Sequence, residues 1–109
     1  MNILVNLDTP QFVSWLAGSQ KISDDYMAKT FPTLARPILE ASDGSRYIRI
    51  IRRGQTNRGG SAHAFIDRTT GDVLKPASWK APAKHARGNI FDDKNGLGSM
   101  GQYGPAYLR

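Results

Sequence analysis

The side chains best suited to chemistry in this sequence lie in one short segment, residues 75–89, which reads KPASWKAPAKHARGN. Its lysines and arginines can neutralise phosphate groups and release the counterions that surround a polyanion. Its tryptophan, Trp79, offers an aromatic surface on which an unpaired base of any identity can stack. The segment therefore predicts contact with a phosphate chain. In the alternative interpretation, Trp79 packs over a sheet edge as core and the lysines are simply solvated.

The basic charge of the chain is concentrated around this segment. Residues 45–90 contain ten Lys and Arg and two acidic residues, a net charge of +8, whereas residues 1–44 have a net charge of −2. The whole chain carries +6, with a sequence pI near 10.0, which favours polyanionic partners. We predict a nucleic-acid-binding surface made of eight residues from the basic stretch. They are Arg49, Arg53, Arg58, Lys75, Trp79, Lys80, Lys84 and Arg87.

Catalysis and metal binding have weaker support in the sequence. His63 and Asp67 are expected on one strand face, roughly 13 Å apart at about 3.3 Å per residue, which is too far to ligate one ion. The other histidine, His85, lies among lysines that repel a metal cation. The chain has no cysteine, so a disulfide or a thiolate nucleophile is excluded. We expect no enzyme activity, no metal and no cofactor, and a nuclease is the enzymatic alternative.

Two short helices are expected in the N-terminal part, residues 1–32, after an extended arm. Thr9 followed by Pro10 is typical of a helix start, because the threonine hydroxyl can cap free backbone amides. Proline is suited to the first helical position, because the backbone N–H that it lacks would have no partner within the helix. Gly18 is expected to end the first helix. Ser23 and the acidic residues after it predict a second start, and Pro32 ends that helix.

The pattern changes to a period of two in residues 34–76 and predicts a four-stranded antiparallel meander. Turns are expected at Asp43-Gly44, where glycine takes a positive φ, and at Thr70-Gly71, in a hairpin with a glycine bulge. Between them, the strand from Arg46 to Arg53 should carry Arg49 and Arg53 on one face.

Residues 77–109 are expected to form a basic arm and a glycine-rich tail. Prolines 76 and 82 prevent one long helix, so the cations lie on an extended arm or on a short helix that begins near Pro82. The tail should be irregular and held on the sheet by its apolar side chains. These anchors are Ile90, Phe91, Tyr103, Tyr107 and Leu108. The three parts make one α+β domain of residues 1–109.

The N-terminus has no basic start before an apolar run, so it does not resemble a secretory signal, and no apolar run has the length of a membrane span. We therefore expect a soluble intracellular protein that is not secreted.

The segment AFIDRTTGDVLKPASWKAPAKHARGNIFD, residues 64–92, and the closing YGPAYLR resemble small uncharacterised proteins of bacteriophages and marine viruses. This resemblance covers about the C-terminal half of the chain. It implies a viral context, in the host cytoplasm or the virion, and it transfers no activity and no site residues.

These observations predict a non-enzymatic protein that binds nucleic acid, with single strands preferred and no sequence specificity. The alternative is a viral structural or host-interaction protein that applies the same basic surface to an acidic protein partner.

Overall fold

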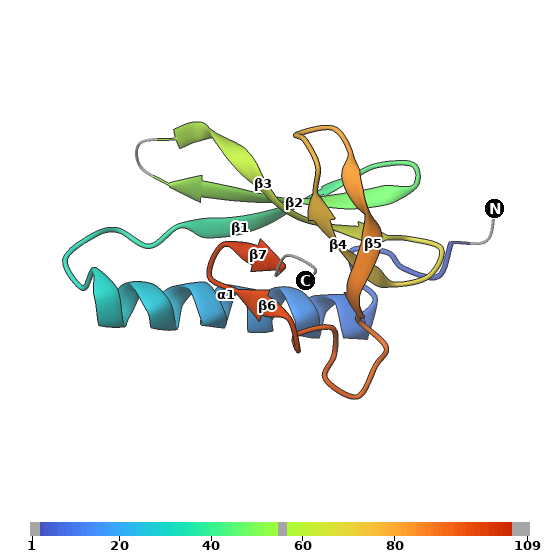
Figure 1. Cartoon of the computed structure of the whole chain (residues 1–109), viewed down its shortest axis with the longest axis horizontal. Coiled ribbons are helices and arrows are strands. Elements are labelled where there is room, and N and C mark those ends of the chain that lie inside the picture. Colours follow the sequence, from blue (N-terminus) through green and yellow to red (C-terminus); the bar gives the residue numbers. More distant parts are fainter. Residues whose placement is uncertain (1–2, 55–56, 106–109) are drawn as a thin grey trace.

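A computed structural model describes residues 3–54 and 57–105, except for the side chains of residues 57 and 58. One long helix runs beneath a curled antiparallel sheet, and a small two-stranded hairpin lies beside the helix (Figure 1). The α+β class is confirmed, and the described residues form one helix instead of two and a main sheet of five strands instead of four. No helix in the described part of the chain has the length and apolarity that a membrane crossing requires.

The helix α1, Pro10–Thr30, is continuous through both positions where the sequence predicted a break. Gly18 costs a helix about 1 kcal/mol relative to alanine, but packing offsets this cost. An added Cβ at Gly18 would lie 2.6 Å from the side chain of Leu97, so glycine admits a close neighbour at this point. Ser23 lies in the middle of α1 with its side chain buried, so it does not cap a second helix. The end before Pro32 and the start at Pro10 are confirmed.

Thr9 precedes the helix but does not cap its amides with its side chain. Its hydroxyl instead accepts a hydrogen bond of 2.8 Å from the backbone amide of Asn6. This bond shapes the turn between the extended N-terminal arm and α1. The arm itself is held by the amides of Leu4 and Val5, which both donate to the carbonyl of Arg68.

The main sheet is an antiparallel meander in which each strand pairs with the next along the chain. Its strands are β1 (Ile38–Asp43), β2 (Tyr47–Gly54), β3 (Asn57–Asp67), β4 (Asp72–Pro76) and β5 (Pro82–Asn89). The first four confirm the predicted meander. The fifth strand is the predicted basic arm, which pairs along β4 from Asn89 to Pro82. Pro82 is tolerated there because β5 is an edge strand with one side free of ladder bonds.

The two predicted turns differ in outcome. Gly71 has φ +82°, its amide donates to the carbonyl of Asp67 over 2.7 Å, and the Asp67 carboxylate accepts from the amide of Thr69 over 2.9 Å. The glycine-bulge hairpin is therefore confirmed. Gly44 has no positive φ, so that part of the prediction was wrong. Its amide donates to the carbonyl of Tyr47, which closes the β1–β2 turn without left-handed backbone.

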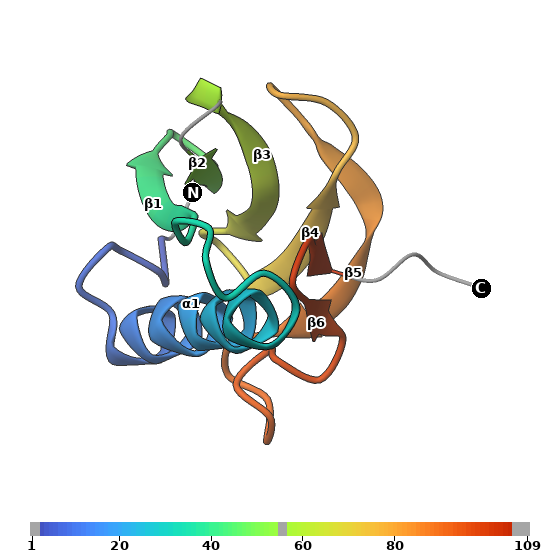
Figure 2. The same cartoon turned by 90° about the vertical axis from the view of Figure 1, so that its left-hand side faces the viewer.

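Register shifts bend the sheet in two of its strand pairs. The β2–β3 pair shifts at Ile50/Ile51 and again after Arg52, and the β4–β5 pair shifts on both sides of Leu74. Bulges of this kind increase the local twist. Figure 2 shows the result, a curled sheet in which the loop between β4 and β5 arches back toward β3.

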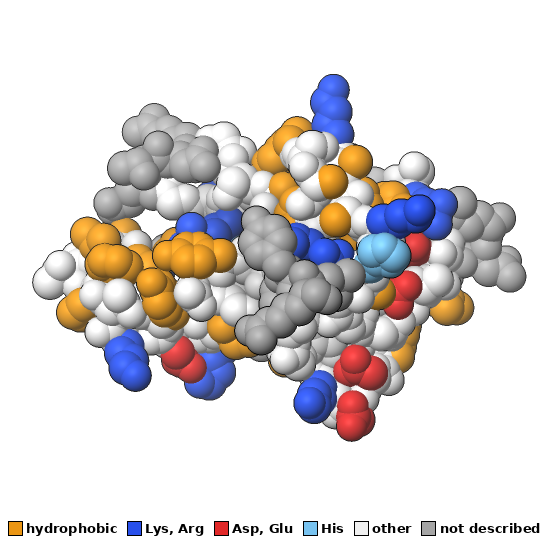
Figure 3. All heavy atoms as spheres, viewed as in Figure 1, with side chains coloured by type: hydrophobic (Ala, Val, Ile, Leu, Met, Phe, Trp, Pro, Cys, Tyr) orange, Lys and Arg blue, Asp and Glu red, His pale blue; other side chains and the backbone are white. Residues whose placement is uncertain are grey.

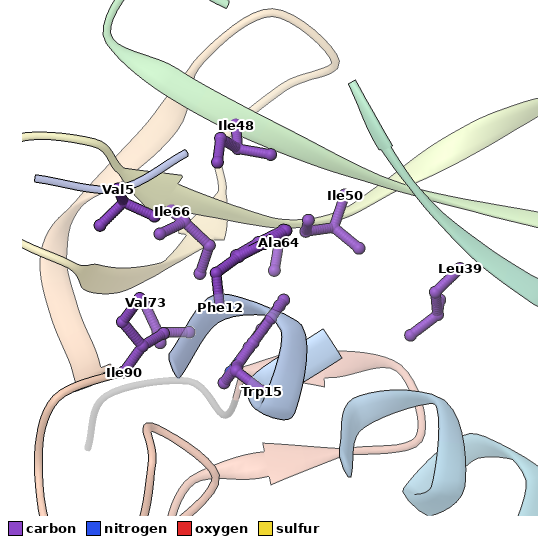
Figure 4. Packing of buried hydrophobic residues seen from close by; sticks show 10 residues of the cluster. All are labelled: Val5, Phe12, Trp15, Leu39, Ile48, Ile50, Ala64, Ile66, Val73 and Ile90. Carbon is purple, nitrogen blue, oxygen red and sulfur yellow. The ribbon is translucent and has the colours of Figure 1, made fainter. Parts of the chain in front are cut away.

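The core lies between α1 and the face of the sheet that covers it, here called the inner face. Phe12 and Trp15 from α1 meet aliphatic side chains of the strands (Figure 4). The strand residues in this cluster are Leu39, Ile48, Ile50, Ala64, Ile66 and Val73. Ile48 and Ile50 alternate with Tyr47 and Arg49, which therefore lie on the opposite, outer face.

The C-terminal part is irregular, as predicted, except for the hairpin of β6 (Met100–Gly101) and β7 (Gly104–Pro105). Ile90 is buried and anchors the segment. Tyr103, although 61% exposed, lies against Tyr26 and Arg52, whereas Phe91 is exposed. Tyr107 and Leu108 lie outside the described residues. The hairpin packs against α1, β3 and β4, so the tail docks beside the helix on the inner side of the sheet.

Candidate nucleic-acid interface

A hollow of about 390 Å³ opens on the outer face, at the end of the sheet where β1 turns into β2. Its walls are the turn of residues 42–46 and Lys80 of the β4–β5 loop, and Tyr47, Arg49 and Phe65 also line it. Arg49 pairs with Phe65 across β2 and β3, so the two side chains stand on the same face. The bent β4–β5 hairpin supplies the wall that a flat sheet would lack.

Arg49 is the central cation of the hollow. Its guanidinium carbon lies 4.6 Å from the ring centre of Trp79 and 6.0 Å from that of Phe65. The residue is half-buried, and its Nε is buried without a hydrogen-bond partner among the described residues. Arg49 also makes no ion pair with any described carboxylate. A partly desolvated guanidinium of this kind is stabilised by an anion that approaches from the open side.

The β4–β5 loop holds Trp79 over this cation. The amides of Ala77 and Ser78 both donate to the carbonyl of Ala81, over 3.0 and 3.1 Å, and the Lys80 amide donates to the Ser78 hydroxyl over 3.3 Å. Trp79 is 40% exposed, so one part of the ring covers Arg49 while another part remains accessible. A cation and an aromatic surface therefore share one site.

The carboxylates near the hollow already have basic partners. Asp43, which lines the hollow, pairs with Arg68 over 2.8 Å. Arg46, on the same wall, lies 3.6 Å from Asp67. The charges of Arg49 and Lys80 are therefore left to dominate the potential inside the hollow.

The other predicted binding residues lie at different distances from this site. Arg53 stands on the outer face by alternation but at the far end of β2, where it pairs with Glu40 over 2.6 Å. Lys84 is exposed and Arg87 is half-buried on β5, and the Arg87 guanidinium donates to the carbonyl of His85. The side chain of Arg58 lies outside the described residues.

Lys75 lies on the other face of the sheet. Its neighbour Leu74 pairs with Phe65 on the outer face, so Lys75 points to the inner side, where its ammonium donates to the carbonyl of Pro105 over 3.1 Å. The structure thus brings together Arg49, Trp79 and Lys80. In Figure 3, Lys and Arg side chains occupy several separate places on the face seen there and do not form one continuous patch.

Two aromatic residues of the hollow were absent from the predicted set. Tyr47 and Phe65 are in edge-to-face contact, with ring centres 6.2 Å apart and planes at 80°. Alternation with Ile48 and Ile66 signals that both point away from the core. The register between β2 and β3, which brings them side by side, has no local signal in the sequence.

A second basic group forms on the inner side, where the β6–β7 hairpin covers it. Arg52 lies 5.3 Å from the ring centre of Tyr103, and Lys75 binds the Pro105 carbonyl. His63 is 2% exposed, and neither of its ring nitrogens has a hydrogen-bond partner in the described part of the protein. Burial first, and then the charges of Arg52 and Lys75, lower the pKa of His63 to about 4, which keeps the ring neutral.

Among the described residues, no group of three or more His, Asp and Glu side chains is placed to hold a metal ion. Comparison with known proteins gives one result. The model of a family of unknown function, DUF7717, matches residues 13–104. No curated protein and no solved structure matches the chain.

Proposed function

This chain belongs to the DUF7717 family, whose function is unknown, and we propose that it is a non-enzymatic protein that binds single-stranded nucleic acid through the outer face of its sheet. The binding is independent of sequence. The bacteriophage and marine viral resemblance of the C-terminal half is consistent with a protein that handles viral nucleic acid.

The observation that carries the proposal is the state of Arg49. Its guanidinium is half-buried between Trp79 and Phe65, has no carboxylate partner among the described residues and borders an open hollow. Arginines inside a protein are normally paired, as Arg68 is with Asp43. Arg52 also lacks a carboxylate partner among the described residues, but Tyr103 of the β6–β7 hairpin covers it, whereas Arg49 borders open space. A phosphate group in the hollow would give Arg49 the missing counter-charge, with Lys80 beside it.

The aromatic side chains favour a single strand. Trp79, Tyr47 and Phe65 stand beside the cation, and an unpaired base can stack on an aromatic ring whereas a base inside a duplex cannot. Stacking and phosphate contacts do not distinguish one base from another, so sequence specificity is not expected.

Further cations extend the site along β5. Ala86 pairs with Leu74, which stands on the outer face, and Lys84 follows in the irregular part of β5 between Ala86 and Pro82. A strand that leaves the hollow past Lys80 would then meet Lys84, which is exposed.

Fluorescence anisotropy of labelled single-stranded DNA, RNA and duplex DNA against salt concentration tests the proposal. We expect single strands to bind more tightly than duplex, with affinity falling log-linearly as salt rises. The double variant Lys80→Glu/Lys84→Glu should bind all sequences more weakly and flatten the salt slope by about one to two, since each phosphate contact contributes about 0.9.

The matched control is Lys29→Glu/Lys94→Glu, which changes the net charge equally at two exposed lysines outside the hollow. An equal loss in both double variants would mean that only total charge matters and would contradict a defined site. Absence of binding to all three polymers at low salt would overturn the proposal in favour of an acidic protein partner.

A further inference from the structure

The hollow has a volume that admits a single small ligand. Its volume of about 390 Å³ is at the lower end of the range of about 300–1,000 Å³ that small-molecule sites occupy. The β1–β2 turn and the β4–β5 loop rise on its sides. A long nucleic acid can cross the outer face, but the space between these walls suits only a small segment of it.

The cations in the hollow suit one phosphate group. The guanidinium of Arg49 presents a planar set of donors. Its Nε is buried without a hydrogen-bond partner among the described residues, so a phosphate in the hollow would meet the terminal nitrogens. The ammonium of Lys80 adds a mobile donor from the facing wall. Because Asp43 is already paired with Arg68, its carboxylate does not compete fully for these donors.

The aromatic rings in the hollow suit one base. Tyr47 and Phe65 line it, and Trp79 stands against Arg49 at its border. The hydroxyl groups of Ser42 and Ser45 on the turn give hydrogen-bonding partners to a base or sugar edge. Phosphate donors and base-stacking surfaces therefore line or border the same hollow, whereas an inorganic anion would use only the donors.

Building on the proposed function, we infer that the hollow is a mononucleotide subsite. One nucleotide of the bound strand enters it, with its phosphate on Arg49 and Lys80 and its base against the aromatic side chains. Free nucleoside monophosphates therefore bind in the same place, more tightly than the nucleoside or inorganic phosphate alone.

NMR titration of the full-length ¹⁵N-labelled protein tests this inference. Three probes are compared: adenosine 5′-monophosphate, adenosine and inorganic phosphate. The nucleotide should move the amide signals of Tyr47, Arg49, Phe65 and Lys80 and the indole signal of Trp79. We expect at least a tenfold higher affinity for the nucleotide than for either of its halves, because both sets of contacts form together.

Two variants separate the contribution of the Trp79 ring to nucleotide affinity from that of the Arg49 guanidinium. Trp79→Ala should reduce nucleotide affinity toward that of inorganic phosphate, and Arg49→Lys should weaken it several-fold because lysine keeps the charge but loses the planar stacked group. Phe91→Ala is the matched aromatic control, since Phe91 is 45% exposed and lies outside the hollow. It should leave nucleotide affinity unchanged.

The outcomes distinguish the subsite from the broader proposal. If oligonucleotides bind but the nucleotide binds no better than phosphate, or shifts signals elsewhere, the mononucleotide subsite is wrong and the proposed function stands. If neither the oligonucleotides nor the nucleotide binds at low salt, both fail.

Discussion

Arg49 and Arg52 lie on the same strand, β2, and the sheet turns them to opposite faces. Each guanidinium lies against an aromatic ring, Trp79 for Arg49 and Tyr103 for Arg52, and each Nε is buried without a hydrogen-bond partner among the described residues. The surroundings differ. Arg49 borders an open hollow, whereas Arg52 lies under the β6–β7 hairpin.

We interpret this difference as two roles for the positive charge that is concentrated in the sequence, one in the proposed binding and one in packing. On the outer face, Arg49 and Lys80 border space that a ligand can fill. On the inner side, Arg52 and Lys75 hold the C-terminal hairpin through Tyr103 and Pro105. Changes on the inner side should therefore affect stability, and changes on the outer face should affect binding.

The largest expected effect is a loss of stability that differs between the two tryptophans. Trp15→Ala removes a completely buried ring from the core and should lower the free energy of unfolding by about 3–5 kcal/mol. Trp79→Ala removes a partly exposed ring and one cation–π contact, which should cost less than about 1.5 kcal/mol. Urea denaturation measures both values. Similar losses for the two variants would place Trp79 in the core and contradict its role as a binding surface.

The next effect concerns the buried imidazole of the inner side. The pKa of His63 is about 4 in the folded protein and near 6.5 in the unfolded chain, so between these values the unfolded chain takes up a proton that the folded protein does not. The free energy of unfolding should therefore fall, as pH falls from about 6.5 to about 4, by an amount on the order of 3 kcal/mol.

Urea denaturation across this pH range, compared with His63→Leu, isolates the contribution of that one residue. The variant should show a shallower decline, because leucine has no proton to gain. His85→Leu is the control, since His85 is exposed, and it should leave the decline unchanged. Identical pH profiles for His63→Leu and the unmodified protein would show that the imidazole is not held neutral by its surroundings.

A smaller loss of stability is expected when Gly104 is changed, in the β6–β7 hairpin that covers the inner side. Gly104 has φ +108°, and an added Cβ would overlap the carbonyl oxygen of His63. Gly104→Ala should therefore lower the free energy of unfolding by about 1–3 kcal/mol. Gly101→Ala, in the same hairpin, should cost less, because the nearest atom to its Cβ would be 3.7 Å away and its φ is not positive.

Nucleic-acid affinity measured below the unfolding transition should be the same for both glycine variants. A weaker affinity in Gly104→Ala without a loss of stability would connect the hairpin to the binding face, and the proposed separation of the two sides would then be wrong.

The sheet was largely predictable from the sequence because its signals are local. Asp67 and Gly71 specify their hairpin within five residues, and the alternation around Ile48 and Ile50 identifies the two faces of β2. The single helix was not predictable in the same way. Gly18 is tolerated because Leu97 packs against it, and that contact joins residues far apart in the chain.

The candidate site was predictable only in part, for the same reason. Composition identified Arg49, Trp79 and Lys80 as members of a basic stretch, but the contact between Arg49 and Trp79 depends on the bulges that bend β4 and β5. Lys75 was grouped with them because its charge is visible in the sequence, whereas its direction depends on pairing between β3 and β4.

Trp79 fluorescence in a Trp15→Phe variant tests whether nucleic acid binds at the outer-face hollow, because this variant has Trp79 as its only tryptophan. The change conserves an aromatic core residue, so the fold should be retained. We expect single-stranded DNA and RNA to quench the Trp79 emission to saturation, at the same concentrations at which anisotropy reports binding, since bases stack against the ring. Binding by anisotropy with an unchanged emission spectrum and intensity would contradict this expectation and would place the nucleic acid away from the outer-face hollow.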